Sequence, residues 1–410
     1  MQISIVSDLH LGDPMCALYP ETPKKFAPKL KAFEKAVGTG NDYLILLGDI
    51  FDFSIRSYAE VYAEGKKFFS HVQEKQLAKE ILYVPGNHDF SFWHWLEHDL
   101  NIVKPIQNGE DPRPFRRSVP GFFDLRKAPK YSELELVGPD KPYGDIFLKH
   151  LAPQDLKICV AYPNVYLYTG QETLLLTHGH YLEAFWGVVS EYGPKIFGGD
   201  MAGDELNLKE LVGVNFPNNQ LASSGVGQAE PLTALIRTLQ RNIKDGDLNA
   251  LERYVNNLAD KVVDPLITGN VLKEWITDKI INILKDKLLN FIREQKTARV
   301  KNETECGDSP FMSEQGTKDR LETYYKASQW EIEDVGEQLG IKLSPPRRCI
   351  IGHTHDPIPW GAMDQKNKYR LAGNPVVLFN TGGWLYRKDG SFCGAQVFKW
   401  DGTQMSSVGV

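Results

Sequence analysis

Five short apolar segments of the chain each lead into side chains that can bind a metal ion. The segments are residues 3–7, 43–48, 80–86, 172–179 and 348–352, and the side chains at their ends are Asp8 with His10, Asp49 with Asp52, Asn87 with His88 and Asp89, His178 with His180, and His353 with His355. Imidazole rings supplemented by oxygen ligands suit manganese, iron, cobalt or zinc better than calcium or magnesium. The pattern therefore indicates a metal site that is assembled from distant parts of the chain.

Each of these motifs is weak evidence by itself. An isolated Asp-x-His is common, and Asn-His-Asp after a glycine is usually a turn with an exposed histidine. The set is stronger, because six of the ten histidines fall in these motifs, each near a carboxylate, an amide or a second histidine. The other four histidines belong to none of the motifs and receive no role: His71, His94, His98 and His150.

The segments that carry these side chains have the pattern of buried strands. They are nearly continuous aliphatic runs bounded by polar residues, as in strands that are covered on both faces in a layered α/β domain. Ligand sites of such sheets form beyond the carboxyl ends of the strands, so we expect the motifs to converge on one crevice. Glycines beside the motifs allow the sharp turns that this requires, namely Gly12, Gly48, Gly86 and Gly352.

Residues from about 225 to 340 follow a different pattern. Their apolar residues recur at intervals of three and four, which is the helical period, and one further helix is predicted over Lys318–Gln329. We therefore predict a core made of residues 1–183 and 345–410, with a mostly helical insertion, residues 184–344, that caps the metal site.

One segment of this insertion, residues 271–296, is strongly amphipathic. The simplest interpretation is a helix packed on the core or on a neighbouring helix. Two alternatives stay open: a lid or membrane-surface helix that admits a lipid tail, and a helix pair that forms a dimer.

The motifs Asp-x-His, Gly-Asp-x-x-Asp, Gly-Asn-His-Asp, His-Gly-His and Gly-His-Thr-His occur along the chain in this order. In this order they resemble the calcineurin-like metallophosphoesterase superfamily, and the resemblance covers the core but not the helical insertion. It implies an α/β fold, a sandwich of two mixed β-sheets flanked by helices, with two metal ions at the strand ends. It assigns Asp8, His10, Asp49 and His355 to the first ion, and Asp49, Asn87, His178 and His353 to the second, with Asp49 bridging.

The resemblance also implies a reaction. Two divalent or mixed-valence transition-metal ions (manganese, iron, zinc or cobalt) would share a hydroxide that hydrolyses a phosphomonoester, phosphodiester or pyrophosphate bond. His88 would act on the leaving oxygen as the main catalytic residue. Asp52 and Asp89 match catalytic-site positions that orient histidines, and His180 is a candidate substrate contact.

The composition limits which binding partners and which cellular compartment we expect. The formal net charge is -6, which argues against general binding of nucleic acid through a positive field. The five cysteines are scattered and lack a C-x-x-C motif, so they are interpreted as reduced thiols. Because the sequence also shows neither a signal peptide nor an apolar run that could span a membrane, we expect a cytoplasmic protein.

The sequence leaves the substrate open. The segments SDLHLG (residues 7–12) and FNTGGWL (residues 379–385) are similar to the branch that contains the UDP-diacylglucosamine pyrophosphatases of lipid A synthesis, which can carry arginine where this chain has His88. We expect a phosphorylated small molecule or a lipid-linked substrate, and we leave peripheral membrane contact and oligomer formation open. A DNA nuclease is less favoured because of the acidic balance, and a non-catalytic scaffold is least favoured because every ligand is present.

Overall fold

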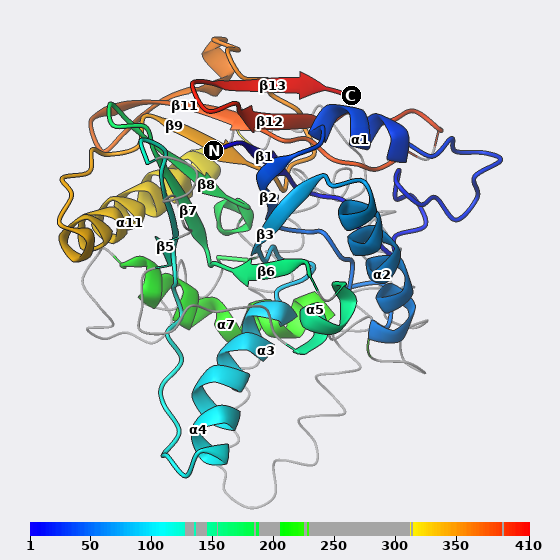
Figure 1. Ribbon diagram of the computed structural model, residues 1–410. Coiled ribbons are helices and arrows are strands. Elements are labelled where there is room, and N and C mark those ends of the chain that lie inside the picture. The colour runs from blue at the N-terminus through cyan, green and yellow to red at the C-terminus, as the bar shows by residue number, and fades with distance from the viewer. Residues whose placement is uncertain are drawn as a thin grey trace, which may run out of the picture. The chain divides into compact units, whose positions relative to one another are not determined.

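The computed structural model of the protein contains two β-sheets packed face to face, with helices on their outer sides (Figure 1). The structure describes residues 1–127, 135–136, 146–153, 155–183, 186–187, 206–224, 228, 312, 315–387 and 389–410. Contacts divide the chain into one unit of Met1–Gln228 with Cys306–Val410, and a second unit of Ala229–Glu305 that lies outside the described residues. Both sheets belong to the first unit.

The first sheet has the strand order β13-β12-β1-β2-β3-β6. Its strands are β1 (Ile3–Val6), β2 (Asn41–Leu47), β3 (Ala78–Val84), β6 (Lys157–Val160), β12 (Gln396–Trp400) and β13 (Met405–Gly409). Strands β1, β2, β3 and β6 run parallel, whereas β12 pairs antiparallel with β1 and with β13. Because parallel neighbours end at the same edge, the residues after β1, β2 and β3 are brought together there.

The second sheet has the order β10-β11-β9-β8-β7-β4-β5. Its strands are β4 (Gly121–Asp124), β5 (Glu135–Leu136), β7 (Asn164–Tyr168), β8 (Thr173–Thr177), β9 (Arg348–Ile351), β10 (Lys368–Leu371) and β11 (Asn374–Asn380). Strand β9 is parallel to β8 and to β11. The histidine motifs that follow β8 and β9 therefore lie at one edge of this sheet.

Helices flank both sheets. They are α1 (Leu30–Val37), α2 (Tyr58–Glu74), α3 (Ser91–His98), α4 (Lys104–Gln107), α5 (Ile146–Leu151), α7 (Leu208–Ser224) and α11 (Gln315–Leu339), with the π-helical turn η1 (Asp99–Val103) and the 3-10 turns η2 (His180–Leu182) and η5 (Gln365–Asn367). Helix α2 begins with a capping box of Ser57 and Glu60, which satisfies two backbone N–H groups of its first turn. In Figure 1, α1 and α2 lie on the opposite side of the paired sheets from α11.

Helix α11 is bound to the second sheet by apolar and polar contacts. Its buried Leu321 and Ile332 belong to the main hydrophobic core. The carboxylate of Glu331 accepts hydrogen bonds from Tyr166 (2.8 Å) and Asn164 (3.0 Å), both on β7. Although α11 falls within the predicted insertion, it is therefore an integral part of the core packing.

The predicted fold class is confirmed: two mixed β-sheets are flanked by helices. The five aliphatic segments form β1, β2, β3, β8 and β9, and the helix predicted over Lys318–Gln329 forms as part of the longer α11. The division into a core and an insertion at residues 184–344 stays a prediction. Its amphipathic segment, residues 271–296, lies outside the described residues.

The cysteines differ in part from the expectation. Cys16, Cys159 and Cys349 are free and buried, as predicted for reduced thiols. Cys393 is disulfide-bonded, so the prediction of reduced thiols throughout is wrong. Among the described helices, none combines the length and the apolar character needed to cross a membrane.

Candidate metal centre

The predicted ligands lie on backbone of an uncommon conformation. Five of the seven have a positive φ, namely Asp8 (53°), His10 (48°), Asp49 (53°), His353 (66°) and His355 (54°). Residues other than glycine rarely adopt this left-handed backbone conformation, and those that do concentrate at functional sites. The sharp turns that they form after β1, β2 and β9 aim the side chains across the edges of the sheets.

Three of the ligands form what we call the first cluster: Asp8, His10 and His355. Nε2 of His355 lies 3.1 Å from Nε2 of His10 and 3.2 Å from Oδ1 of Asp8. The third separation, between Nε2 of His10 and Oδ1 of Asp8, is 3.9 Å. All three side chains are buried, so their lone pairs face one another rather than bulk water.

The remaining four ligands form the second cluster: Asp49, Asn87, His178 and His353. Nε2 of His178 lies 3.0 Å from Oδ2 of Asp49 and 3.1 Å from Oδ1 of Asn87. Nδ1 of the same ring donates a hydrogen bond to the carbonyl of Leu47 (3.0 Å). The backbone bond thus leaves Nε2 as the atom that His178 presents to the cluster.

The spacing of these atoms fits a bound ion. Two ligands with metal bonds of about 2.0–2.1 Å, at an angle of about 90–109°, are separated by about 2.9–3.4 Å. The close separations within the two clusters are 3.0, 3.1, 3.1 and 3.2 Å. The residues present therefore suit one transition-metal ion in each cluster.

Two glycines make room for the ligands. Gly48 has a φ of +86°, and a Cβ built on it would collide with the ring of His178. A Cβ on Gly86 would collide with the carboxylate of Asp49. The second cluster can form only because these positions lack a side chain.

The carboxylate of Asp52 contacts two histidines at once. Its Oδ2 lies 3.1 Å from Nδ1 of His10, and its Oδ1 lies 3.0 Å from Nδ1 of His88. The hydroxyl of Ser54 donates to Asp52 and lies 2.8 Å from the same Nδ1 of His88. Asp52 therefore contacts both His10 and His88, and its role in orienting these histidines stays a prediction.

Comparison with protein families agrees with this geometry. Residues 1–190 match the model of the family described as calcineurin-like phosphoesterase. Residues 1–190 therefore carry a calcineurin-like phosphoesterase domain, which supports the predicted metallophosphoesterase superfamily. The match ends before His353 and His355, which the second sheet brings to the same site. No curated protein matches the chain.

The matched family implies the coarse activity. The protein is a metal-dependent phosphoesterase, a hydrolase of phosphoester bonds. The clusters of histidine and aspartate supply groups that could hold the metal ions of such an enzyme.

The position of Asp89 in this phosphoesterase differs from the expectation. Its carboxylate accepts hydrogen bonds from the N–H groups of Ile50, Phe51 and Gly86 and from the hydroxyl of Tyr83, rather than from a histidine ring. These bonds join the loop that carries Asp49 to the loop that carries Asn87. Asp89 therefore shapes the second cluster through the backbone.

His180 lies beside His178 and belongs to a chain of hydrogen-bonded polar side chains. Its Nε2 is 3.2 Å from the hydroxyl of Tyr162, which is 2.8 Å from the hydroxyl of Tyr181. Burial and the neighbouring His178 hold the pKa of His180 well below its usual value, which favours the neutral ring. The side chain is 1% exposed, and the predicted contact with substrate stays a prediction.

Two residues of the site were missed by the sequence analysis. Ser54 contacts His88, and Glu183 places its Oε2 2.7 Å from Nε2 of His353. Each lies within three residues of a motif, which is the only signal that could have drawn attention to it. Neither residue type indicates its partner, because serine and glutamate are common at protein surfaces.

The charges of the site favour a cation. Burial raises the pKa of Asp49, but His178 and His88 lower it more, and it remains well below its usual value. Burial lowers the pKa of His178, but Asp49 raises it more, to about 9. The buried carboxylate thus prefers a positive partner, which is the preference that a metal ion satisfies.

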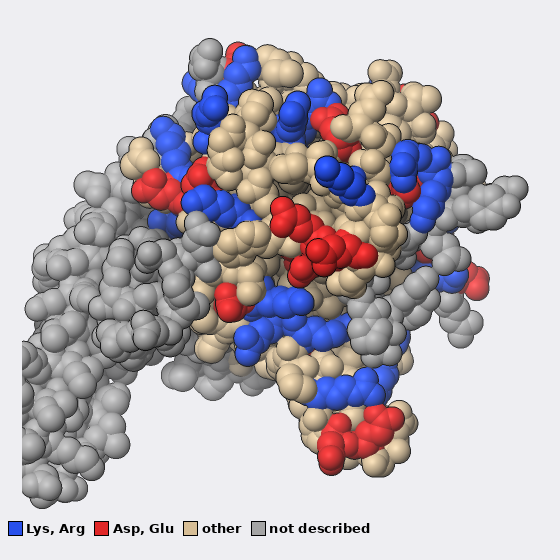
Figure 2. Space-filling model, turned by 90° about the vertical axis from the view of Figure 1, so that its left-hand side faces the viewer, with Lys and Arg blue, Asp and Glu red and all other residues tan. Residues whose placement is uncertain are grey.

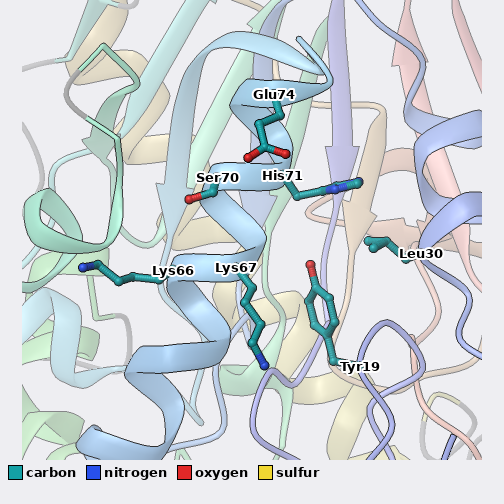
Figure 3. Close-up of a pocket in the computed structure, with 7 residues that line it drawn as sticks. All are labelled: Tyr19, Leu30, Lys66, Lys67, Ser70, His71 and Glu74. Atoms are coloured by element: carbon teal, nitrogen blue, oxygen red, sulfur yellow. The ribbon is translucent and has the colours of Figure 1, made fainter.

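A separate pocket of about 500 Å³ lies beside α2 (Figure 3) and is lined by Tyr19, Leu30, Lys66, Lys67, Ser70, His71 and Glu74. None of these residues is a predicted site residue. Lys67 is paired with Glu64 (2.7 Å), and His71 with Glu34 (2.8 Å). Since these charges are paired within the protein, we assign the pocket no part in the reaction.

Proposed function

We propose that this phosphoesterase binds two transition-metal ions and hydrolyses a phosphomonoester, phosphodiester or pyrophosphate bond. The observation that supports this best is the grouping of all seven predicted ligands into two clusters with metal-like spacing. Asp8, His10 and His355 would hold one ion, and Asn87, His178 and His353 the other. Asp49 would bridge the two.

Two imidazoles in each cluster favour manganese, iron, zinc or cobalt. Bound ions would supply a hydroxide nucleophile at neutral pH and positive charge for the phosphoryl oxygens. The protein contributes the fixed positions of the ligands. The outer nitrogen of His10 is bonded to Asp52, and that of His178 to the carbonyl of Leu47.

His88 is the residue best placed to move a proton. Its side chain is 25% exposed, whereas the ligands of the first cluster are buried. With Nδ1 held by Asp52 and Ser54, the opposite ring nitrogen, Nε2, would protonate the leaving oxygen of the substrate. The Asp52 carboxylate would stabilise the protonated ring.

The surface charges do not favour nucleic acid as the substrate. On the face shown in Figure 2, acidic side chains gather near the middle, and lysine and arginine side chains surround them. Together with the net charge of -6, this mixture does not favour general attraction of a polyanion. Cytoplasmic location is part of the proposal, which leaves peripheral membrane contact and self-association open.

The test begins with metal-free protein. After addition of manganese, iron, zinc or cobalt, elemental analysis should find up to two ions per chain. The reconstituted protein is then assayed on phosphomonoesters, phosphodiesters, nucleotides, DNA and UDP-linked lipids. Absence of bound metal, together with no gain of hydrolysis on any substrate, would contradict the proposal.

A further inference from the structure

A buried carboxylate contacts the outer nitrogen of His353. Oε2 of Glu183 lies 2.7 Å from Nε2 of His353, and the two side chains are 1% and 9% exposed. This length is typical of a charge-assisted N–H···O hydrogen bond. Away from water such a bond is strong, so it gives the ring one preferred orientation.

Glu183 is itself held by the turn that carries it. It directly follows η2, and its N–H donates to the carbonyl of His180 (3.0 Å). The preceding carbonyl, of Leu182, accepts a hydrogen bond from Arg320 on α11 (2.7 Å). The carboxylate is therefore presented to His353 by backbone that is fixed on both sides.

The geometry separates Glu183 from the ligands. No group of metal-binding atoms found among the described residues includes it. Its distance to His353 is also shorter than the 3.0–3.2 Å separations within the two clusters. With Nε2 facing Glu183, Nδ1 is the atom that His353 can offer to the second cluster.

The first cluster contains an equivalent pair. There, Asp52 contacts Nδ1 of His10 at 3.1 Å, and Nε2 of the same ring faces the other ligands. Each cluster thus has one histidine with a buried carboxylate on its outer nitrogen. Such carboxylates orient the ring and make its inner nitrogen a better ligand.

We propose that Glu183 is a positioning residue that strengthens metal binding by the second cluster through His353. The proposal rests on the proposed function, since it requires that the second cluster hold an ion. Loss of a comparable outer partner typically weakens metal binding by about 10–100-fold.

The test compares Glu183→Ala and Glu183→Gln, each combined with His355→Ala so that the remaining ion reports on the second cluster. Titration of metal-free protein with Co²⁺, followed by calorimetry and by the visible absorption of the bound ion, gives the affinity and the ligand geometry. We expect Glu183→Ala to bind about 10–100-fold more weakly. Glu183→Gln should lose less, because its amide oxygen can still accept a hydrogen bond from Nε2.

Glu331→Gln is the matched control, since Glu331 is also buried and its hydrogen-bond partners among the described residues lie outside the two clusters. Combined with His355→Ala, it should bind Co²⁺ as tightly as the protein that carries His355→Ala alone. Unfolding of the metal-free forms shows whether each variant folds. If Glu183→Ala does not fold, Glu183→Gln decides.

Three results would overturn the role of Glu183. The first is unchanged Co²⁺ affinity in the folded variants, and the second is equal weakening by the Glu331→Gln control. The third is an equal loss of affinity for both ions when the Glu183 variants are made with His355 intact. If the unmutated protein binds two ions and hydrolyses a phosphoester, any of these results refutes only the role of Glu183; if it binds none, the proposed function fails as well.

Discussion

Nε2 of His10 and Nε2 of His355 lie 3.1 Å apart, although 345 positions separate the two residues in the chain. Two neutral imidazoles at this distance can share a single N–H···N bond, whereas a cation between them satisfies both lone pairs. Asp8 adds a carboxylate oxygen 3.2 Å from the His355 nitrogen. This contact between the two ends of the chain is the basis of the first cluster.

His355→Ala should therefore leave one ion per chain in place of two. We expect hydrolysis to fall by more than the roughly 10–100-fold loss in affinity or activity typical of an outer partner, because a direct ligand is removed. Elemental analysis and initial rates measure both effects. His150→Ala, at an exposed histidine on α5, should change neither, and equal metal content in the two variants would argue against the first cluster.

His88→Ala should lower kcat by roughly 10²–10⁴ on a substrate with a poor leaving group, which is the usual contribution of general acid catalysis. Metal content should stay unchanged, since His88 belongs to neither cluster. A series of aryl phosphoesters with leaving groups of different pKa tests the role. Equal losses across the series would show that His88 does not protonate the leaving oxygen.

Gly48→Ala and Gly40→Ala separate backbone strain from collision with a ligand. Both glycines have a positive φ (+86° and +75°), but only at Gly48 would the added Cβ collide with His178. Gly40→Ala should cost roughly 1–2 kcal/mol of unfolding free energy and keep both ions. Gly48→Ala should cost more and lose the second ion, as measured by denaturation and elemental analysis.

Asp89→Ala should destabilise the metal-free protein. It removes the acceptor of three buried N–H groups and a tyrosine hydroxyl. Because each unpaired buried group costs about 1–3 kcal/mol, we expect a loss of at least about 3 kcal/mol in urea denaturation. Asp42→Ala removes a partly exposed ion pair with Lys79 and an exposed hydrogen bond from the N–H of Gln2, and should cost less, about 1–2 kcal/mol. A similar loss in both variants would contradict this role of Asp89.

Glu331 should make stability depend on pH. Burial raises its pKa above the usual value of 4.5, and hydrogen bonds from Ser118 and Tyr166 offset the shift only in part. The folded state then binds the Glu331 proton more tightly than the unfolded state does. The free energy of unfolding that comes from this proton is fully present below pH 4.5 and is lost as the pH rises through the folded pKa.

Glu331→Gln removes this dependence, since an amide does not ionise. The free energy of unfolding of the variant, relative to that of the unmutated protein, should increase as the pH rises from about 4.5, by about 1.4 kcal/mol for each unit by which the pKa is raised. Urea denaturation of the metal-free proteins at several pH values measures the difference. A difference that is constant with pH would show that folding does not raise the pKa of Glu331.

The fold and most of the candidate site were predictable from local patterns. Aliphatic runs indicated β1, β2, β3, β8 and β9, and the ligands follow these runs directly. Both signals are local, because burial selects apolar side chains within one strand and the residues after parallel strands meet at one edge. The sequence by itself thus determined which residues could meet.

Only the tertiary structure decided which atoms are in contact. Asp52 reaches His10 and His88 across 42 and 36 positions, and Glu183 reaches His353 across 170. Asp89, in a similar sequence context to Asp52, bonds to backbone N–H groups instead. A carboxylate accepts from any donor within about 3 Å, so its partner depends on the packing of distant segments and not on its neighbours in the chain.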